Sequence, residues 1–240
     1  MSKWRHGRCQ RGARLRFIRV CFSPQADLVG GAIVSGFGVD AVRHLRSRRN
    51  FLPLASLPLI LGVHQIIESL VWWGLEGDVS HGVERLALWA YLVIAFVLLP
   101  VFIPFAIMRI EPTRQRRVAM LPFAAIGVGV AGVLLAALIR GPFSVGIRPH
   151  HLDYFIRQRH GLIIVGFYVV AVCGALLCSS DRHVLVFGLL NVVAIVVIAW
   201  LTSDGFASVW CGWAAVSSGA IAAHMRFAKP YRAHPYLFAQ

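Results

Sequence analysis

The chain has 240 residues, of which 58% are hydrophobic and only 14% charged, and its mean hydropathy is +0.70. Soluble globular proteins are about 45–50% apolar and about 25% charged, and one water-soluble core of this length could not bury so much apolar surface. The composition argues against a soluble enzyme, a disordered protein and a disulfide scaffold, and it indicates an integral membrane protein. The net charge of +14 does not indicate a nucleic-acid partner, because the arginines lie between apolar runs.

Residues 1–19 form a basic N-terminal segment with seven Lys and Arg. No apolar stretch in it precedes a cleavage site, so it is not a secretory signal peptide, and it lacks the clear amphipathic period of a mitochondrial presequence. We expect this extension to be disordered or not native. The natural chain is then expected to start near Val20, since bacteria also initiate at codons that otherwise encode valine.

Seven apolar runs follow, each long enough to cross most or all of a hydrocarbon core. They predict an all-α integral membrane fold, a seven-transmembrane-helix bundle over residues 20–228 followed by a cytoplasmic tail at 229–240. The runs are Asp27–Val42, Leu52–Gly74, Leu86–Met108, Val118–Ile139, Leu162–Cys178, Val184–Leu201 and Ala207–Phe227.

The positions of Lys and Arg in the loops predict the orientation of the bundle. Twelve of these residues follow the first, third, fifth and seventh runs, whereas four lie between the fourth and fifth runs. Since positive charge is retained inside, the N-terminus is expected outside and the C-terminus inside. The expected location is the bacterial inner membrane, with the lipid bilayer as partner. The basic residues 1–19 contradict this orientation.

The first run begins with a capping signal. Ser23 or Asp27 could cap the helix N-terminus, with Pro24 in the first turn, and capping is the simpler interpretation of Asp27. Asp27 nevertheless lies at the outer end, level with Glu68, and could complete a shared site. The glycines of this run would let a neighbouring helix approach closely.

The second run holds the densest set of polar residues. His64, Glu68 and Trp72 are spaced four residues apart and share one helical face, with Gln65 beside them. Ionisable groups in a spanning helix cost about 2.5–3.5 kcal/mol on insertion, so they require a reason. One reason is a site for a proton, cation or metal at His64 and Glu68. The other is an interhelical hydrogen-bond clamp, with Trp72 and Trp73 in the aromatic belt at the outer interface.

Three further segments carry weaker signals. Pro100 and Pro104 are expected to kink the third run. The outer segment with His150, His151, Asp153 and His160 is expected to be a solvated loop, with a metal site as the alternative. In the last run, the alternatives are a tightly packed helix and one that brings Cys211 or Ser217 towards the His64–Glu68 pair.

Several motifs resemble a bacterial multi-pass membrane family known only as a domain of unknown function. They are Cys21-Phe22-Ser23 with Asp27, His64-Gln65 with Glu68, the Val-Trp-Trp-Gly-Leu-Glu-Gly stretch at 71–77, and Ser208-Val-Trp-Cys211. The resemblance implies a multi-pass membrane fold and brings no activity. A looser similarity links the chain to seven-helix hydrolases of the alkaline ceramidase and adiponectin-receptor type. Those proteins have two His four residues apart in the last helix, whereas His224 has Ala220 and Ala228 at that spacing.

Three functions remain open from the sequence, and whether the chain is an enzyme is undecided. The first is a small-solute or ion/proton-binding sensor or transporter. The second is a metal-dependent hydrolase acting on lipid, with a divalent metal as cofactor. The third is a structural membrane partner without a site, in which neighbouring helices satisfy the His–Glu pair completely. Candidate ligand- or ion-binding residues are His64, Glu68, Asp27, Gln65 and Ser217, and candidate metal ligands are His64, Glu68 and Cys211.

Overall fold

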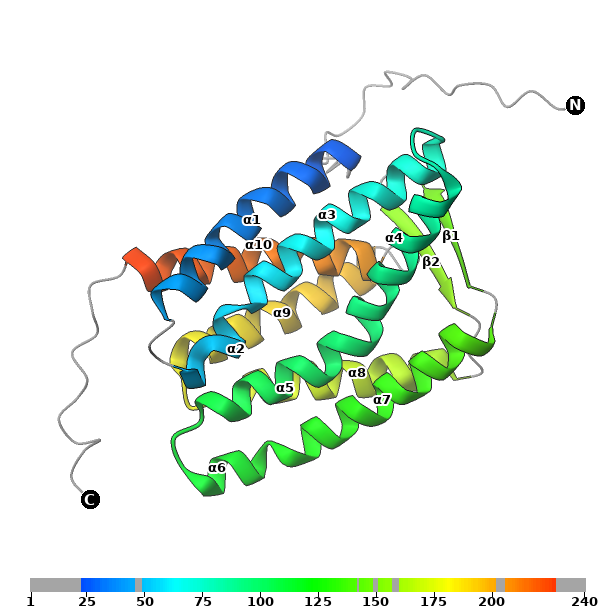
Figure 1. Cartoon of the computed structure of the whole chain (residues 1–240). Coiled ribbons are helices and arrows are strands. Elements are labelled where there is room, and N and C mark those ends of the chain that lie inside the picture. Colours follow the sequence, from blue (N-terminus) through cyan, green and yellow to red (C-terminus); the bar gives the residue numbers. More distant parts are fainter. Residues whose placement is uncertain are drawn as a thin grey trace, which may run out of the picture.

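The structure, a computed structural model, describes residues 23–45, 49–141, 143–148, 151–156, 160–201 and 206–227. Within these ranges the chain forms a bundle of seven long helical rods and one β-hairpin (Figure 1). The rods lie where the apolar runs predicted helices, which confirms the helical fold. The expectations for residues 1–19, for a start at Val20 and for the tail at 229–240 lie outside the described residues.

Some rods consist of several helical pieces in direct succession, and local capping sets several of their ends. Ser23, Ser80 and Thr113 each accept a hydrogen bond from a backbone N–H three residues further on, and Gly77 ends the second rod with a φ of 89°. In chain order the elements are α1 Pro24–His44; η1 Arg49–Phe51, α2 Leu52–Ala55 and α3 Leu57–Glu76; α4 His81–Val93, the π-helical turn η2 Ile94–Leu98 and α5 Leu99–Ile110; α6 Arg114–Ala119 and α7 Leu121–Arg140; β1 Phe143–Arg148 and β2 His151–Ile156; α8 Gly161–Leu177; α9 Arg182–Leu201; and α10 Phe206–Phe227.

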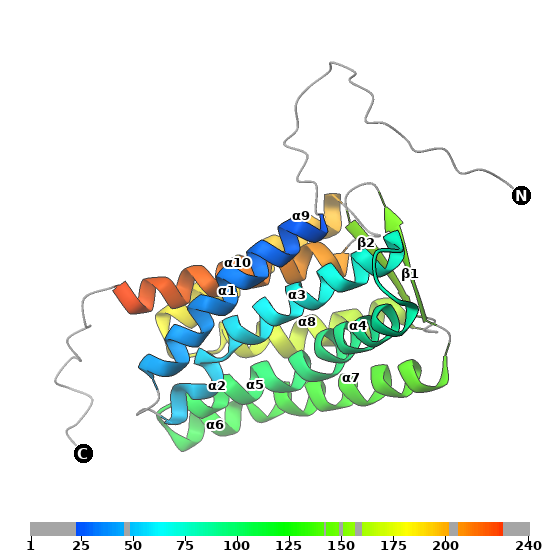
Figure 2. The ribbon, with the colours of Figure 1, turned by 45° about the horizontal axis from the view of Figure 1, so that its top comes forward.

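The rods pack side by side in a closed ring (Figures 1 and 2). Following the ring, α1 contacts α3, α3 contacts α4, α5 contacts α7, α7 contacts α8, α8 contacts α9, and α9 contacts α10. Contacts between α10 and α1 close the ring, and α3 also contacts α10. The first and last helices are therefore neighbours, and α3 contacts both of them.

Glycines on α1 and α3 bring these two helices together. A Cβ atom on Gly31 would lie 2.6 Å from the carbonyl oxygen of Gly62, and one on Gly38 would collide with the backbone of Leu59. A Cβ on Gly62 would meet Ser35 of α1. This close approach confirms the role expected for the glycines of the first run at Gly31 and Gly38, and it draws the N-terminal half of α1 against α3.

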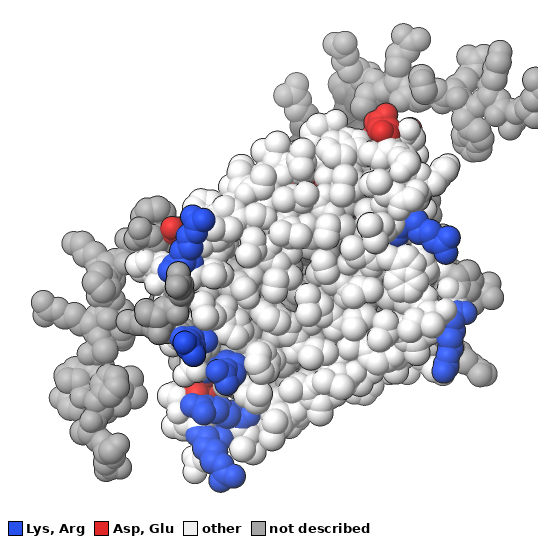
Figure 3. Space-filling model, viewed as in Figure 1, with Lys and Arg blue, Asp and Glu red and all other residues white. Residues whose placement is uncertain are grey.

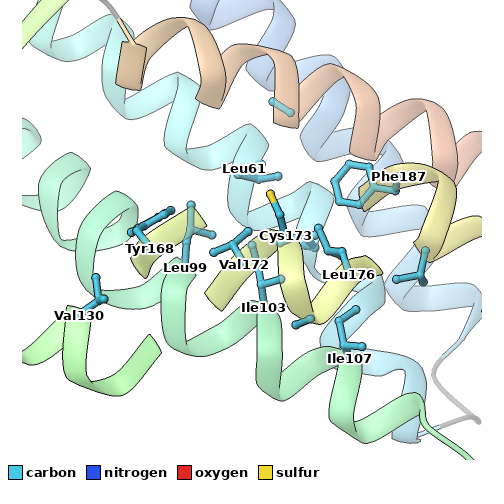
Figure 4. Close-up of a cluster of buried hydrophobic side chains, with 14 of the residues drawn as sticks. Leu61, Leu99, Ile103, Ile107, Val130, Tyr168, Val172, Cys173, Leu176 and Phe187 are labelled. Carbon is cyan, nitrogen blue, oxygen red and sulfur yellow. The ribbon is translucent and has the colours of Figure 1, made fainter. Parts of the chain in front are cut away.

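Two clusters of buried apolar side chains fill the bundle. The larger cluster, which we call the apolar core, joins α1, α3, α5, α7, α8, α9 and α10 and includes Leu61, Leu99, Ile103, Val172 and Phe187 (Figure 4). The smaller cluster lies at the hairpin end, around Trp72, Tyr91 and Leu152.

The outside of the bundle is apolar as well. Leu162 is 90% exposed, Trp200 85% and Leu86 72%. Lys and Arg gather at the two ends of the face in Figure 3, and the surface between them carries almost no charge. Four of the described helices are long and apolar enough to cross a membrane, namely Arg49–Glu76, His81–Ile110, Arg114–Arg140 and Arg182–Trp200, and α8 is a shorter apolar helix. These features fit a lipid environment.

The segment expected as a solvated loop contains an antiparallel β-hairpin, so the fold is not purely α-helical. Val145 pairs with Tyr154 and Gly146 with Asp153. Phe143, Val145 and Tyr154 pack against the smaller apolar cluster, and Leu152 belongs to it. Packing against α3 and α10 thus gives the hairpin an apolar face to bury.

The third rod contains a π-helical turn, and one residue separates the end of this turn from the first proline of the rod. The turn spans Ile94–Leu98 and precedes Pro100, which has no N–H to donate. The carbonyl of Ala95 in this turn accepts a hydrogen bond of 2.7 Å from the hydroxyl of Tyr168 on α8. Figure 1 shows α4 and α5 meeting at an angle, as expected from the prolines.

Candidate functional site

A buried polar cluster lies at the hairpin end of the bundle, where the first, second and last rods meet. We call the following eight residues the polar cluster: Asp27 on α1, His64, Gln65, Glu68 and Trp72 on α3, Tyr91 on α4, Tyr154 on β2 and Cys211 on α10. His64, Glu68 and Tyr91 have no exposed surface, and Asp27 is 3% exposed. Tyr154 is the one member that is half-buried. Such burial of two carboxyl groups is costly and calls for an explanation.

Glu68 lies at the centre of the cluster. Its Oε2 accepts a hydrogen bond from the Gln65 amide at 3.1 Å, and its Oε1 accepts a longer one from the Tyr154 hydroxyl at 3.4 Å. Burial, and after it the negative charge of Glu68, raise the pKa of the Tyr154 phenol, which therefore stays protonated and can donate. The hairpin thus supplies a donor to a carboxyl group on α3.

Asp27 faces the cluster from the first turn of α1. Ser23 caps this helix through its hydroxyl, so the interpretation of Asp27 as the cap is wrong. The Asp27 carboxyl lies beside the Trp72 indole and close enough to Glu68 to interact with its charge. Among the residues that the structure describes, neither Oδ2 of Asp27 nor Nε1 of Trp72 has a hydrogen-bond partner. Two buried carboxyl groups from two helices therefore share one environment.

His64 joins the cluster to α4. Its Nε2 lies 3.2 Å from the carbonyl oxygen of Tyr91. A carbonyl only accepts, so Nε2 carries the proton of this hydrogen bond. The imidazole stacks on the Tyr91 ring at 4.1 Å, and Tyr91 stacks in turn on Tyr154 at 4.3 Å. Within the described part of the chain, Nδ1 of His64 and the hydroxyl of Tyr91 have no hydrogen-bond partner.

The structure corrects the expected position of one tryptophan and places two other candidates. Trp72 is only 5% exposed and packs inside the bundle, so it does not belong to an interfacial belt. Cys211 lies within the polar cluster, close to Glu68 and Tyr91. The hydroxyl of Ser217, further along α10, donates to the carbonyls of Trp213 and Ala214 in its own helix.

The residues present do not fit a metal ion. In the part of the chain that the structure describes, no three His, Cys, Asp or Glu residues are placed so that they could hold one. His64, Glu68 and Cys211, the set expected as ligands, therefore provide no metal geometry there. Of the outer His residues, His160 is exposed at the start of α8, whereas His150 and the side chains of His151 and Asp153 lie outside the described part.

A cavity lies beside the polar cluster, towards the opposite end of the bundle. Most of its lining is apolar, and Cys211 is the member of the polar cluster that reaches it. The carboxyl groups of Asp27 and Glu68 do not line this cavity. Its lining residues are Leu57, Leu61, Leu99, Ile103, Tyr168, Val172, Leu176, Phe187, Asn191, Trp210, Cys211 and Ala214.

Sequence reasoning missed Tyr91, Tyr154 and a buried carboxylate at the other end of the bundle. Glu111 is 1% exposed and accepts hydrogen bonds from Ser179 at 2.9 Å and from the hydroxyl of Ser180 at 2.7 Å. It ties the segment after α5 to the segment between α8 and α9, which is a structural role. A glutamate next to Pro112, in a gap between apolar runs, could have suggested such a role.

The fold and the cluster define a helical bundle with an apolar exterior and a polar interior site. A family model described as "Family of unknown function (DUF6629)" matches residues 20–234, which include every helix and strand described above. The chain belongs to this family. No curated protein and no solved structure matches the chain.

Proposed function

We propose that this chain is a multi-pass protein of the bacterial cell membrane that binds a proton at the Asp27–Glu68 carboxyl pair, as a sensor or transporter. The proposal includes seven membrane spans, with the N-terminus and the hairpin outside and the C-terminus inside. Four helices with spanning length and composition, the apolar exterior and the exposed arginines at the end opposite the hairpin support this placement.

One observation supports proton binding above all: two carboxyl groups are buried together at the interface of α1 and α3. Moving one ionised carboxylate out of water costs several kcal/mol, and a second negative charge beside it adds repulsion. Two such groups favour holding a proton between them, because the doubly ionised pair carries both costs. This geometry supports the pair as the proton-binding site.

The space around the two carboxyl groups also suits a proton better than a larger ligand. The cavity beside the cluster is lined mostly by apolar side chains and does not include the carboxyl groups of Asp27 or Glu68. A small solute would need a cavity with convergent polar groups. A proton needs only an acceptor, and Oδ2 of Asp27 is a buried acceptor without a partner.

The test is infrared difference spectroscopy of the purified full chain in lipid nanodiscs, titrated with acid. Protonated carboxylic acids have a carbonyl stretching band that carboxylates lack. We expect a pH-dependent band in the wild type that loses intensity in Asp27→Asn and in Glu68→Gln. In each variant the midpoint of the remaining band should also move, because the two acids interact.

Glu76→Gln is the matched control, since Glu76 lies on the same helix and is exposed. This variant should keep the wild-type band of the buried pair. Near-UV circular dichroism checks that each variant is folded. A wild-type spectrum without a pH-dependent carboxylic-acid band, or one that neither Asp27→Asn nor Glu68→Gln changes, would overturn the proposal.

A further inference from the structure

In the part of the chain that the structure describes, the polar cluster lies near one end of the bundle. Asp27 lies in the first turn of α1, and Glu68 lies in the last half of α3, so both are near the end that carries the hairpin. Seven members of the cluster are buried, whereas Tyr154 of the hairpin is half-buried. Its hydroxyl contacts Oε1 of Glu68 at 3.4 Å. The Tyr154 hydroxyl is buried against Glu68, and Tyr154 is the member of the cluster that has the most exposed surface, at the hairpin end.

Towards the other end, the interior is filled by the apolar core. Leu61 and Leu57 follow His64 along α3 in that direction, and Ile103 and Ile107 of α5 lie beside them in the same core, as Figure 4 shows for Leu61, Ile103 and Ile107. Leu61 is 2% exposed and Ile107 is fully buried. These apolar side chains, three of which line the cavity described above, offer no hydrogen-bonding group that could pass a proton.

Several polar groups that the structure describes within or beside the apolar core are bonded to backbone carbonyls. The amide of Asn191 donates to the carbonyl of Phe187, and the hydroxyl of Ser218 donates to that of Ala215, each within its own helix. Tyr168 donates to Ala95, and Cys173 is packed among apolar residues. The cavity between these groups is mostly apolar, and cavities of that kind stay dry.

We propose that the Asp27–Glu68 pair exchanges its proton only with the side of the membrane on which the hairpin lies, and that exchange passes through the Tyr154 hydroxyl. In this exchange a hydronium ion gives a proton to the phenolic oxygen and leaves as water, while the phenolic proton moves to Oε1 of the Glu68 carboxylate, and release runs in reverse. The inference rests on the proposed proton binding, and it favours a sensor over a transporter. The protein then senses pH on the hairpin side and does not transport protons across the bilayer.

All ionisable groups that face the pair from the described elements belong to this one end. They are His64 of α3, Tyr91 of α4, Tyr154 of β2 and Cys211 of α10. None of them extends the cluster beyond the apolar core. Protonation of the pair removes negative charge from the contact between α1 and α3, so its consequence is expected in the packing of these two helices.

The test uses the full chain in sealed liposomes on an infrared reflection cell, where perfusion changes only the external pH. Molecules with the hairpin outward should protonate at once, and the remainder only after a protonophore equalises the internal pH. The amplitude of the first step should equal the fraction of molecules whose hairpin faces outward. That fraction is measured by labelling Asp78→Cys, at the hairpin end, with a membrane-impermeant thiol reagent.

Tyr154→Phe should slow the first step about tenfold, which corresponds to a loss of about 1.4 kcal/mol in the exchange step, without changing the final amplitude. Tyr168→Phe is the matched control and should keep the wild-type rate, because Tyr168 lies on the other side of the cluster. An unchanged rate in Tyr154→Phe would refute the route through this hydroxyl.

The remaining outcomes separate the two proposals. The full amplitude in the first step, together with acidification of the liposome interior, would show access from both sides and overturn one-sided exchange while proton binding stands. The absence of a carboxylic-acid band in both steps would contradict proton binding itself.

Discussion

Two glycines on α1 that are only two residues apart have different surroundings. A Cβ on Gly38 would run into the backbone of Leu59, whereas a Cβ on Gly36 would meet nothing within 4 Å. The sequence indicates that the glycines of this helix allow close packing. It does not indicate which of them lie at the contact, because that depends on how α1 is rotated against α3.

This difference predicts opposite effects for one substitution. Gly38→Ala should destabilise the folded chain by about 1–3 kcal/mol, because the new methyl group forces the helices apart. Gly36→Ala should be neutral or stabilise by up to about 1 kcal/mol, because alanine favours a helix over glycine. Unfolding by sodium dodecyl sulfate, followed by circular dichroism, measures both free energies. Equal effects of the two substitutions would contradict the α1–α3 contact.

Part of the polar cluster is predictable residue by residue. The four-residue spacing of His64, Glu68 and Trp72 identifies one helical face, and the structure buries that face. Tyr91 and Tyr154 could not be predicted, because their polar groups reach the cluster from α4 and from the hairpin, far away in sequence. Helical periodicity likewise does not reveal that the hydroxyl of Ser217 donates to a carbonyl of its own helix.

At the scale of elements, the π-helical turn has a backbone carbonyl that accepts a hydrogen bond from another helix. Irregular backbone inside a membrane bundle leaves carbonyl groups that need donors. Tyr168 on α8 supplies one to Ala95. Pro100 and Pro104 predict an irregularity in this helix, but the position of the π-helical turn depends on packing against α7 and α8.

The hairpin was missed because its alternating pattern is short and its apolar face is covered by helices distant in sequence.

The substitution Tyr168→Phe tests how much the hydrogen bond to Ala95 contributes to stability. It should lower the free energy of unfolding by about 1 kcal/mol, because a buried carbonyl loses its side-chain donor. Phe167→Leu, at the neighbouring and 51% exposed position of the same helix, should have an effect near zero. Chemical denaturation in detergent compares the two variants. A cost as large for Phe167→Leu as for Tyr168→Phe would argue against a specific role for the hydroxyl.

At the scale of the whole molecule, charge distinguishes the two ends of the bundle. Exposed arginines gather at the end opposite the hairpin, among them Arg49, Arg114, Arg116 and Arg182. Arg85, near the start of α4, and Arg140, the last residue of α7, lie at the hairpin end. Figure 3 shows Lys and Arg at both ends of one face. The sequence predicted the helix positions well because each apolar run is long and continuous. Which helices become neighbours was not predictable, since lipid-facing and buried sides of these runs are almost equally apolar.

The charge asymmetry predicts which surfaces face outside. Asp78→Cys, in the exposed turn after α3, should react with a membrane-impermeant maleimide in intact cells. Gln115→Cys, on the exposed α6 at the opposite end, should react only after the cells are opened. The unmodified chain supplies the background from its natural cysteines. The reverse pattern of labelling would invert the orientation.

The polar cluster has a consequence for how the protein is made. Its carboxyl groups lie on the first and second rods, which are translated early, whereas Cys211 lies on the last helix, which closes the ring against α1. During synthesis, the surroundings of Asp27 and Glu68 are complete only after the C-terminal helices have been translated. A ribosome that stops early would leave acidic side chains facing lipid, and an incomplete chain of this kind is a natural target for membrane proteases. The last helix to be translated therefore completes the site begun by the first.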